Sequence, residues 1–300
     1  MPRLSISNQK SAITKSLLKW YRKNSRPLPW RKTHHPYRIL VSEIMLQQTQ
    51  VSRVELKYPE FLRRYPTFLA LAHAHPADVI RAWSGMGYNN RALRLRQIAQ
   101  RVVQDLNGKL PKDIDALQHL PGIGRYTANA IACFAFHQQT AVVDTNVRRV
   151  LSRLFPQQAQ SMNEWDLAAW ILPHGKAFDW NQALMELGGT YCTSSTPQCS
   201  LCPLHQYCRS AFKIKKSKKI TPKNRQSIIP NRIYRGRVVS ALRALDHRQS
   251  MDSQRLARIV KPDILLSEKK WFDRLLNGLE KDGLVEIHRR QKNFKVSLPQ

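Results

Sequence analysis

Four of the five cysteines crowd into seventeen residues, and their spacing is typical of metal ligation. Cys192, Cys199, Cys202 and Cys208 are separated by six, two and five residues. In an intracellular protein, clustered thiols indicate a metal site more often than disulfides, because that compartment keeps thiols reduced. Four thiolates can hold zinc or an iron–sulfur cluster, and the spacing does not choose between them. Cys133 lies in an apolar helical stretch and is predicted to be a core residue.

Two carboxylates stand in unusual settings for so basic a chain. Glu43 occurs in "YRILVSEIMLQQTQV", a predicted helix of apolar and amide residues, with Gln47 one turn later. Burial there would raise the pKa of Glu43, which suits a general acid; the alternative is a solvent-facing helical residue. Asp144 follows the apolar "AVV" and opens a predicted helix, where it can cap the N–H of Asn146 or Val147.

The stretch "HLPGIGRYTANAIACF", residues 119–134, places two glycines two residues apart before a predicted helix. Gly122 and Gly124 allow a tight turn and a close approach of another group to the backbone N–H groups. The start of a helix favours a bound anion. This turn therefore predicts a phosphate contact.

Charge is the strongest signal in the composition. The 300 residues carry 50 Lys and Arg against 20 Asp and Glu, a net charge of +30, and basic residues predominate both before and after residue 210. Such a surface favours a polyanionic partner, because each neutralised phosphate releases counterions. With 42% apolar residues, no membrane-length apolar run and no secretory signal, the sequence predicts a globular intracellular protein without membrane contact. A transit peptide in the acid-free first 42 residues is the weaker alternative.

Helical periodicity dominates up to about residue 190, and a boundary follows the cysteines. The segment 211–231 has seven basic residues, no acidic residue and two prolines, which predicts a solvated linker or a DNA-contacting strap. Residues 232–300 then show three short helical patterns and a hairpin with alternating apolar residues. This order suggests a winged helix; a small α+β cap without nucleic-acid contact is the alternative.

Taken together, these motifs resemble the helix-hairpin-helix and iron–sulfur superfamily of DNA glycosylases. The resemblance rests on "LPGIGRYTANAI", Asp144 eighteen residues after Tyr126, and the cysteine spacing; "RPLPWR" and "SEIMLQQTQV" resemble the adenine DNA glycosylases within it. It covers about residues 10–210. It implies an all-α, two-lobed glycosylase domain over residues 1–210, an active site in the cleft between the lobes, and a [4Fe–4S] cluster on the loop 192–208.

The resemblance also implies roles for individual residues. Glu43 matches the catalytic glutamate, which protonates a ring nitrogen of the flipped-out adenine so that a neutral base leaves. Asp144 matches the aspartate that stabilises the oxocarbenium-like sugar, a division of labour similar to that in sugar hydrolases. Tyr126 and Asn146 match positions that flank this pair, and Gly122 and Gly124 would hold a DNA phosphate.

Further matched positions concern the substrate. Those that correspond to the lining of the adenine pocket are Arg26, Trp30, Arg31 and Glu186. Those that correspond to the wedge that enters the duplex and contacts the opposite base are Gln48, Thr49 and Tyr88. Phosphate binding by the arginines and a core position for Trp30 are the alternatives. The expected partner is double-stranded DNA with a mismatch or an oxidised base, bound by a monomer.

Several departures from the family pattern bear on specificity. Asn89 follows Tyr88 where a second aromatic is common, and "DTN" replaces Asp-Gly-Asn. No NUDIX-like domain is apparent after Cys208, which puts a preference for 8-oxoguanine in doubt.

The favoured hypothesis is a monofunctional base-excision repair glycosylase that releases adenine mispaired with guanine or 8-oxoguanine, in the cytoplasm or nucleoid if bacterial. The alternative is a thymine or uracil mismatch glycosylase. An endonuclease III-type lyase is disfavoured, because that chemistry needs a Lys where Tyr126 stands. A non-enzymatic DNA-binding protein is disfavoured by the presence of both Glu43 and Asp144.

Overall fold

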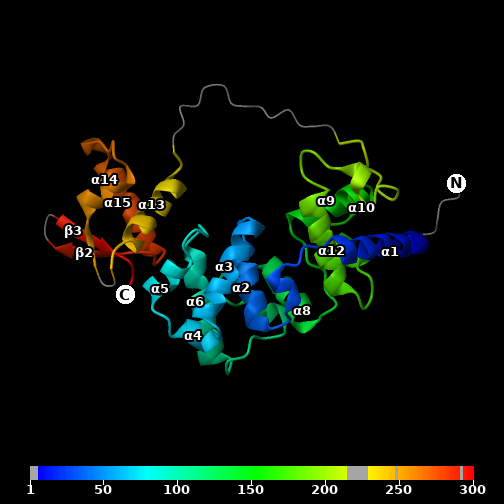
Figure 1. The fold of residues 1–300 in the computed structure, drawn as a ribbon, viewed down its shortest axis with the longest axis horizontal. Coiled ribbons are helices and arrows are strands. Elements are labelled where there is room, and N and C mark those ends of the chain that lie inside the picture. The colour runs from blue at the N-terminus through cyan, green and yellow to red at the C-terminus, as the bar shows by residue number, and fades with distance from the viewer. Residues whose placement is uncertain (1–5, 215–228, 247–248, 291–292) are drawn as a thin grey trace. The chain divides into compact units, whose positions relative to one another are not determined.

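Helices make up most of the chain, as the three- and four-residue spacing of its apolar residues predicts. The computed structural model describes residues 6–214, 229–246, 249–290 and 293–300 (Figure 1). Most of the predicted linker 211–231 lies outside these residues. The chain divides into two units, each with its own internal packing. The predicted fold class, mostly helical with a small C-terminal α+β part, is confirmed.

The first unit is entirely helical within the described residues. Its elements are α1 (Ile6–Asn24), η1 (Pro29–Lys32), α7 (Ile114–Gln118), α8 (Arg125–Phe136), α9 (Thr145–Leu154), α10 (Gln158–Ser161), α11 (Glu164–Ile171), α12 (Ala177–Thr190) and η2 (Cys199–Leu201). The helix α2 (Pro36–Leu46) begins in this unit and passes into the second after Leu40.

The core of the first unit forms where α1 and α9 pack against α12. On α9 the buried residues Val147, Val150, Leu151 and Leu154 recur at helical spacing, so one face of the helix is apolar. Trp180 and Leu184 of α12 belong to the same buried cluster. This packing fixes the N-terminus of α9, where Asp144 lies.

The helices α7 and α8 form the predicted helix-hairpin-helix. Asp113 caps α7 by accepting from the N–H of Ala116. In the hairpin Gly122 has φ +78°, a conformation that favours glycine, and a Cβ there would come within 2.9 Å of Arg94 Cδ. Gly124 is extended and forms the N-cap of α8, so the N–H groups at the start of α8 follow directly after the turn.

The second unit contains the rest of α2 and two groups of elements. The first group is α3 (Val51–Arg64), α4 (Phe68–Ala72), α5 (Pro76–Ala82) and α6 (Asn90–Asp105). The second is α13 (Asn231–Arg243), β1 (Met251–Asp252), α14 (Ser253–Val260), η3 (Leu266–Glu268), α15 (Lys269–Lys281), β2 (Glu286–Arg290) and β3 (Asn293–Ser297).

The C-terminal elements follow the order helix, strand, helix, helix, strand, strand. The two residues of β1 pair with β3, and β3 pairs with β2, in an antiparallel sheet of order β1-β3-β2. The predicted helices and hairpin are present, and β1 is an additional strand too short for an alternation pattern to reveal. Figure 1 shows α13, α14 and α15 gathered beside β2 and β3.

In the described residues no helix has both the length and the apolar character needed to cross a bilayer.

Candidate active-site residues

Asp144 caps α9 with both carboxylate oxygens engaged. Oδ1 accepts from the N–H of Val147 at 2.6 Å, and Oδ2 accepts from the Asn146 side-chain amide at 2.7 Å. The predicted cap is therefore confirmed, with Val147 as the backbone donor. The half-buried carboxylate is fixed in orientation by two short bonds, which is what a catalytic group requires.

Asn146 is held from its other side by Arg149. Arg149 Nη2 donates to Asn146 Oδ1 and to the carbonyl of Gly188, each at 2.7 Å, and its Nε donates to the carbonyl of Cys192 at 2.7 Å. Arg149 thus connects the predicted catalytic residues with the cysteine loop. This role is not visible in the sequence, because three arginines on an amphipathic helix read as surface charge.

Glu186 of α12 is fully buried and carries a dense set of ion pairs. Its Oε1 accepts from Arg26 Nε at 2.6 Å, and its Oε2 accepts from Arg26 Nη2 at 3.0 Å and Arg31 Nη2 at 2.7 Å. Burial alone would raise the pKa of Glu186, but the hydrogen bonds and charges of the two arginines hold that pKa below its ordinary value. Gln182 accepts from Arg31 Nε at 3.0 Å.

The first unit thus brings three of the four predicted adenine-pocket residues together. Trp30 of η1 is buried, which agrees with the alternative prediction that it is a core residue. Tyr126 lies half-buried in the first turn of α8.

Glu43 lies on α2 and is only 4% exposed. Its neighbours Ser42, Ile44 and Met45 are buried as well. The interpretation of Glu43 as a solvent-facing residue is therefore wrong, because a surface helix would expose at least one of these positions. Gln47 lies outside the helix, since α2 ends at Leu46.

The predicted wedge residues lie in two loops of the second unit. Gln48 and Thr49 follow α2, and Tyr88 precedes α6. Gln48 and Tyr88 have φ values of +53° and +44°, which only a supporting structure holds for non-glycine residues. Tyr88 is 52% exposed, so its ring is displayed on the surface of this unit.

A single arginine joins these two loops. Arg91 is 5% exposed, and its Nη2 donates to Thr49 Oγ1 at 2.9 Å and to the carbonyls of Met86 and Gly87 at 3.0 and 3.1 Å. Its Nη1 donates to the last carbonyls of α2 and to that of Gln47. Burial lowers the pKa of Arg91 to about 10. Its role is not visible in the sequence, because a buried arginine and a surface arginine look alike in a helical pattern.

The four clustered cysteines line one pocket, together with Arg153 and Tyr191. Arg153 Nη1 donates to Cys192 Sγ at 3.4 Å, and the N–H of Phe212 donates to Cys199 Sγ at 3.5 Å. Cys133 lies apart in the core, as predicted.

The four thiols of this pocket are donors of the kind that bind metal groups. Burial, together with the proximity of the other three thiols, raises the pKa of Cys202 to about 11. A positively charged metal group would compensate both effects, and donors to the sulfurs are typical of such sites. In the described part of the chain, no three His, Cys, Asp or Glu side chains are arranged to hold a metal ion.

Comparisons with known proteins give the family. Residues 41–170 match the family "HhH-GPD superfamily base excision DNA repair protein". The adenine DNA glycosylase of Mycobacterium tuberculosis is 40% identical, with 95% of this chain and 94% of the relative covered. This chain is a member of the adenine DNA glycosylase family. The human adenine DNA glycosylase is 42% identical over 68% of this chain and 40% of that relative.

Solved structures agree with the fold of this family member. A thermostable thymine-DNA glycosylase matches with a TM-score of 0.65 and 30% identity, over 69% of this chain and 98% of that protein. A non-covalent endonuclease III–DNA complex matches with a TM-score of 0.61 at 23% identity, over 70% of this chain and 98% of the protein compared.

Proposed function

We propose that this protein is a monofunctional DNA glycosylase that hydrolyses the N-glycosidic bond of adenine mispaired with guanine or 8-oxoguanine. The observation that carries the proposal is the near-complete match to adenine DNA glycosylases at 40% identity, in a chain where Glu43 is buried and Asp144 is held by two hydrogen bonds. The partner is double-stranded DNA, in keeping with a net charge of +30.

Glu43 is the proposed general acid. It is only 4% exposed, and burial disfavours the charged form of a carboxyl group. A protonated adenine leaves as a neutral base. The enzyme must first rotate the nucleotide out of the duplex, because the glycosidic bond is otherwise inaccessible to it.

Asp144 is the proposed stabiliser of the positively charged sugar. Its hydrogen bonds from Val147 and Asn146 fix the orientation of the carboxylate. Asn146 is fixed in turn by Arg149, so displacement of either residue would disturb the carboxylate. Tyr126 offers no amine for a Schiff base, which leaves hydrolysis without strand cleavage.

Arg26, Arg31 and Glu186 are proposed to act in adenine recognition as one ion-paired group. We assign base contacts to Arg26, because its side chain is 43% exposed whereas those of Arg31 and Glu186 are 10% and 0% exposed. Gln48, Thr49 and Tyr88 are proposed to enter the duplex and contact the opposite base.

Cys192, Cys199, Cys202 and Cys208 are the proposed ligands of a [4Fe–4S] cluster. Such a cluster would tie the loop to the body of the first unit. Its proposed role is structural, because Arg149 and Arg153 connect this loop to α9. Gly122 and Gly124 are proposed to present backbone N–H groups to a DNA phosphate.

The decisive experiment incubates the purified protein with duplexes that contain A:8-oxoguanine, A:G, A:C, T:G or U:G. Half of each reaction is treated with alkali, which cleaves abasic sites. The proposal predicts adenine release from the first two duplexes and strand breaks only after alkali. Release of thymine without adenine would refute the substrate assignment, and breaks without alkali would refute the monofunctional one.

Thymine or uracil opposite guanine is the second candidate substrate. The solved thymine-DNA glycosylase favours it, because that protein is 30% identical over 69% of this chain. The same duplex series decides between the two candidates.

A further inference from the structure

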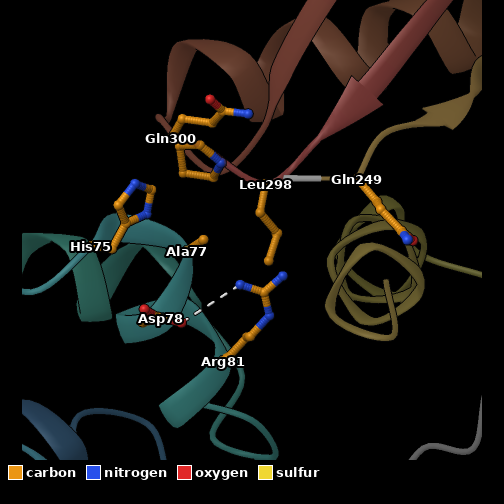
Figure 2. Close-up of a pocket in the computed structure, with 8 residues that line it drawn as sticks. His75, Ala77, Asp78, Arg81, Gln249, Leu298 and Gln300 are labelled. Carbon is orange, nitrogen blue, oxygen red and sulfur yellow. Dashed lines mark ion pairs between the residues drawn. The ribbon is translucent and has the colours of Figure 1, made fainter. Parts of the chain in front are cut away.

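The C-terminal elements share a core with α5 and α6. Ala77 and Ile80 of α5 and Leu93 of α6 belong to the same buried cluster as Val238 and Leu242 of α13. Figure 2 shows the chain end from Leu298 to Gln300 beside α5, where a cavity of about 250 Å³ lies between them. These contacts make the C-terminal elements part of the second unit rather than a tethered module.

Two arginines, one from each side of this apolar contact, donate hydrogen bonds to the other side. Arg243, at the end of α13, donates from Nε to the carbonyl of Ile80 at 3.0 Å and from Nη2 to Asn89 Oδ1 at 2.8 Å. Arg81 of α5 donates in return to the carbonyl of Leu245 at 3.3 Å. Burial lowers the pKa of Arg243 to about 10, so the guanidinium remains charged at neutral pH and its hydrogen bonds are charge-assisted.

Asn89 is the residue directly after Tyr88, the proposed wedge. The loop before it turns through Gly85 and Gly87, both with positive φ. The carbonyl of Gly87 accepts from Trp83 Nε1 at 3.2 Å and from Arg91. Arg91 therefore supports the Tyr88 loop from the α2 side, and Arg243 supports it from the C-terminal elements.

We propose that the C-terminal elements position Tyr88 through the hydrogen bond between Arg243 and Asn89, and thereby influence how the enzyme discriminates the base opposite adenine. Tyr88 has an unfavourable φ of +44° and an exposed ring, so its direction depends on the residues that anchor the loop at each end. Arg243 donates to the side chain of Asn89 and not to its backbone, so this hydrogen bond exists only if residue 89 carries an acceptor. The effect on discrimination of the opposite base rests on the proposed function. The anchoring of the Tyr88 loop by Arg243 does not.

The structural consequence is tested by amide hydrogen exchange on the full chain. Asn89→Ala removes only the acceptor, and Arg243→Met removes only the donors while keeping most of the packing. Both should increase exchange in residues 85–89 and leave exchange in β3 unchanged. The control is Arg235→Ala, which breaks the ion pair with Asp282 inside the C-terminal elements; it should leave residues 85–89 protected. Unchanged exchange at 85–89 in both variants would overturn the proposal.

The catalytic consequence is tested by single-turnover adenine release opposite 8-oxoguanine, guanine and cytosine. Asn89→Ala should reduce discrimination among these opposite bases about tenfold, the scale of one charge-assisted hydrogen bond. Tyr88→Ala should lose discrimination as well, and the double variant should lose no more than Tyr88→Ala alone. Arg243→Lys should restore part of the loss seen with Arg243→Met. Additive losses in the double variant would refute the link to Tyr88.

These two readouts separate the possible failures. If no duplex yields free adenine, the proposed function fails, and the exchange measurement still decides whether Arg243 anchors the loop. If adenine is released but discrimination is the same in wild type and Asn89→Ala, the positioning role fails while the proposed function stands.

Discussion

Gly188 and Asn146 approach each other so closely that α12 tolerates no side chain at position 188. A Cβ on Gly188 would lie 2.6 Å from the Cβ of Asn146, well inside van der Waals contact. The carbonyl of Gly188 also accepts from Arg149, which holds Asn146. The position of Asp144 and Asn146 therefore depends on the absence of a side chain at Gly188 of α12.

Gly188→Ala should displace α9 and reduce the rate of base release about a hundredfold, because an ångström-scale shift of catalytic groups costs about that much. Single-turnover rates on the preferred mismatch would measure it. Gly189→Ala is the matched control, since a Cβ there meets only Arg26 Nη2 at 3.8 Å. Equal rates for the two variants would show that the close contact has no catalytic role.

Asp144 combines a cap with a proposed chemical role, and two substitutions separate them. Asp144→Asn keeps a good N-cap, so its free energy of unfolding should stay close to that of the wild type while base release is lost. Asp144→Ala should lose base release and about 1 kcal/mol of stability. Chemical denaturation and single-turnover assays on both variants check this. If Asp144→Asn still releases the base, Asp144 acts only as the N-cap of α9 and has no chemical role.

Glu186→Gln should destabilise the fold by about 3 kcal/mol at neutral pH, because it leaves Arg31, whose side chain is only 10% exposed, without its counter-charge. The pKa of Glu186 is lowered in the folded protein, so its contribution is fully present above the ordinary carboxyl pKa of about 4.5. The contribution is lost as pH falls from there through the lowered pKa. The stability difference between wild type and variant, measured by urea unfolding, should therefore shrink below pH 4.5; a constant difference would contradict the ion-pair assignment.

Cys202→Ser should abolish bound iron and the visible absorbance of the protein, because the proposed cluster needs four thiolates. Cys133→Ser is the control, as Cys133 is buried in the core and accepts from Asn181 Nδ2 at 3.4 Å. It should retain the iron content of the wild type. Loss of iron in both variants would indicate a general folding defect, and retention in both would exclude Cys202 as a ligand.

Much of the fold follows from local pattern. The α8 helix begins at Arg125, directly after the two glycines of the hairpin, and α14 and α15 fall where apolar residues recur at helical spacing. Asp144 was identifiable as a cap because an acidic residue before a helical run has few other local roles.

Long-range contacts were not predictable in this way. Arg91, Arg149 and Arg243 are arginines on helices, and only tertiary structure shows that each donates to several backbone carbonyls or side chains. Gly188 carries no local signal either, since its conformation is ordinary and only its approach to Asn146 excludes a side chain. The shared core of α13 with α5 and α6 likewise depends on residues more than 130 positions apart.

Glu43 is the residue proposed to protonate the departing adenine. The most direct test compares wild type and Glu43→Gln in single-turnover release of adenine from a duplex with A opposite 8-oxoguanine, at enzyme concentrations that bind all the DNA. We expect Glu43→Gln to bind the duplex with nearly wild-type affinity and to release no measurable adenine. Release by Glu43→Gln at a rate close to that of the wild type would contradict it.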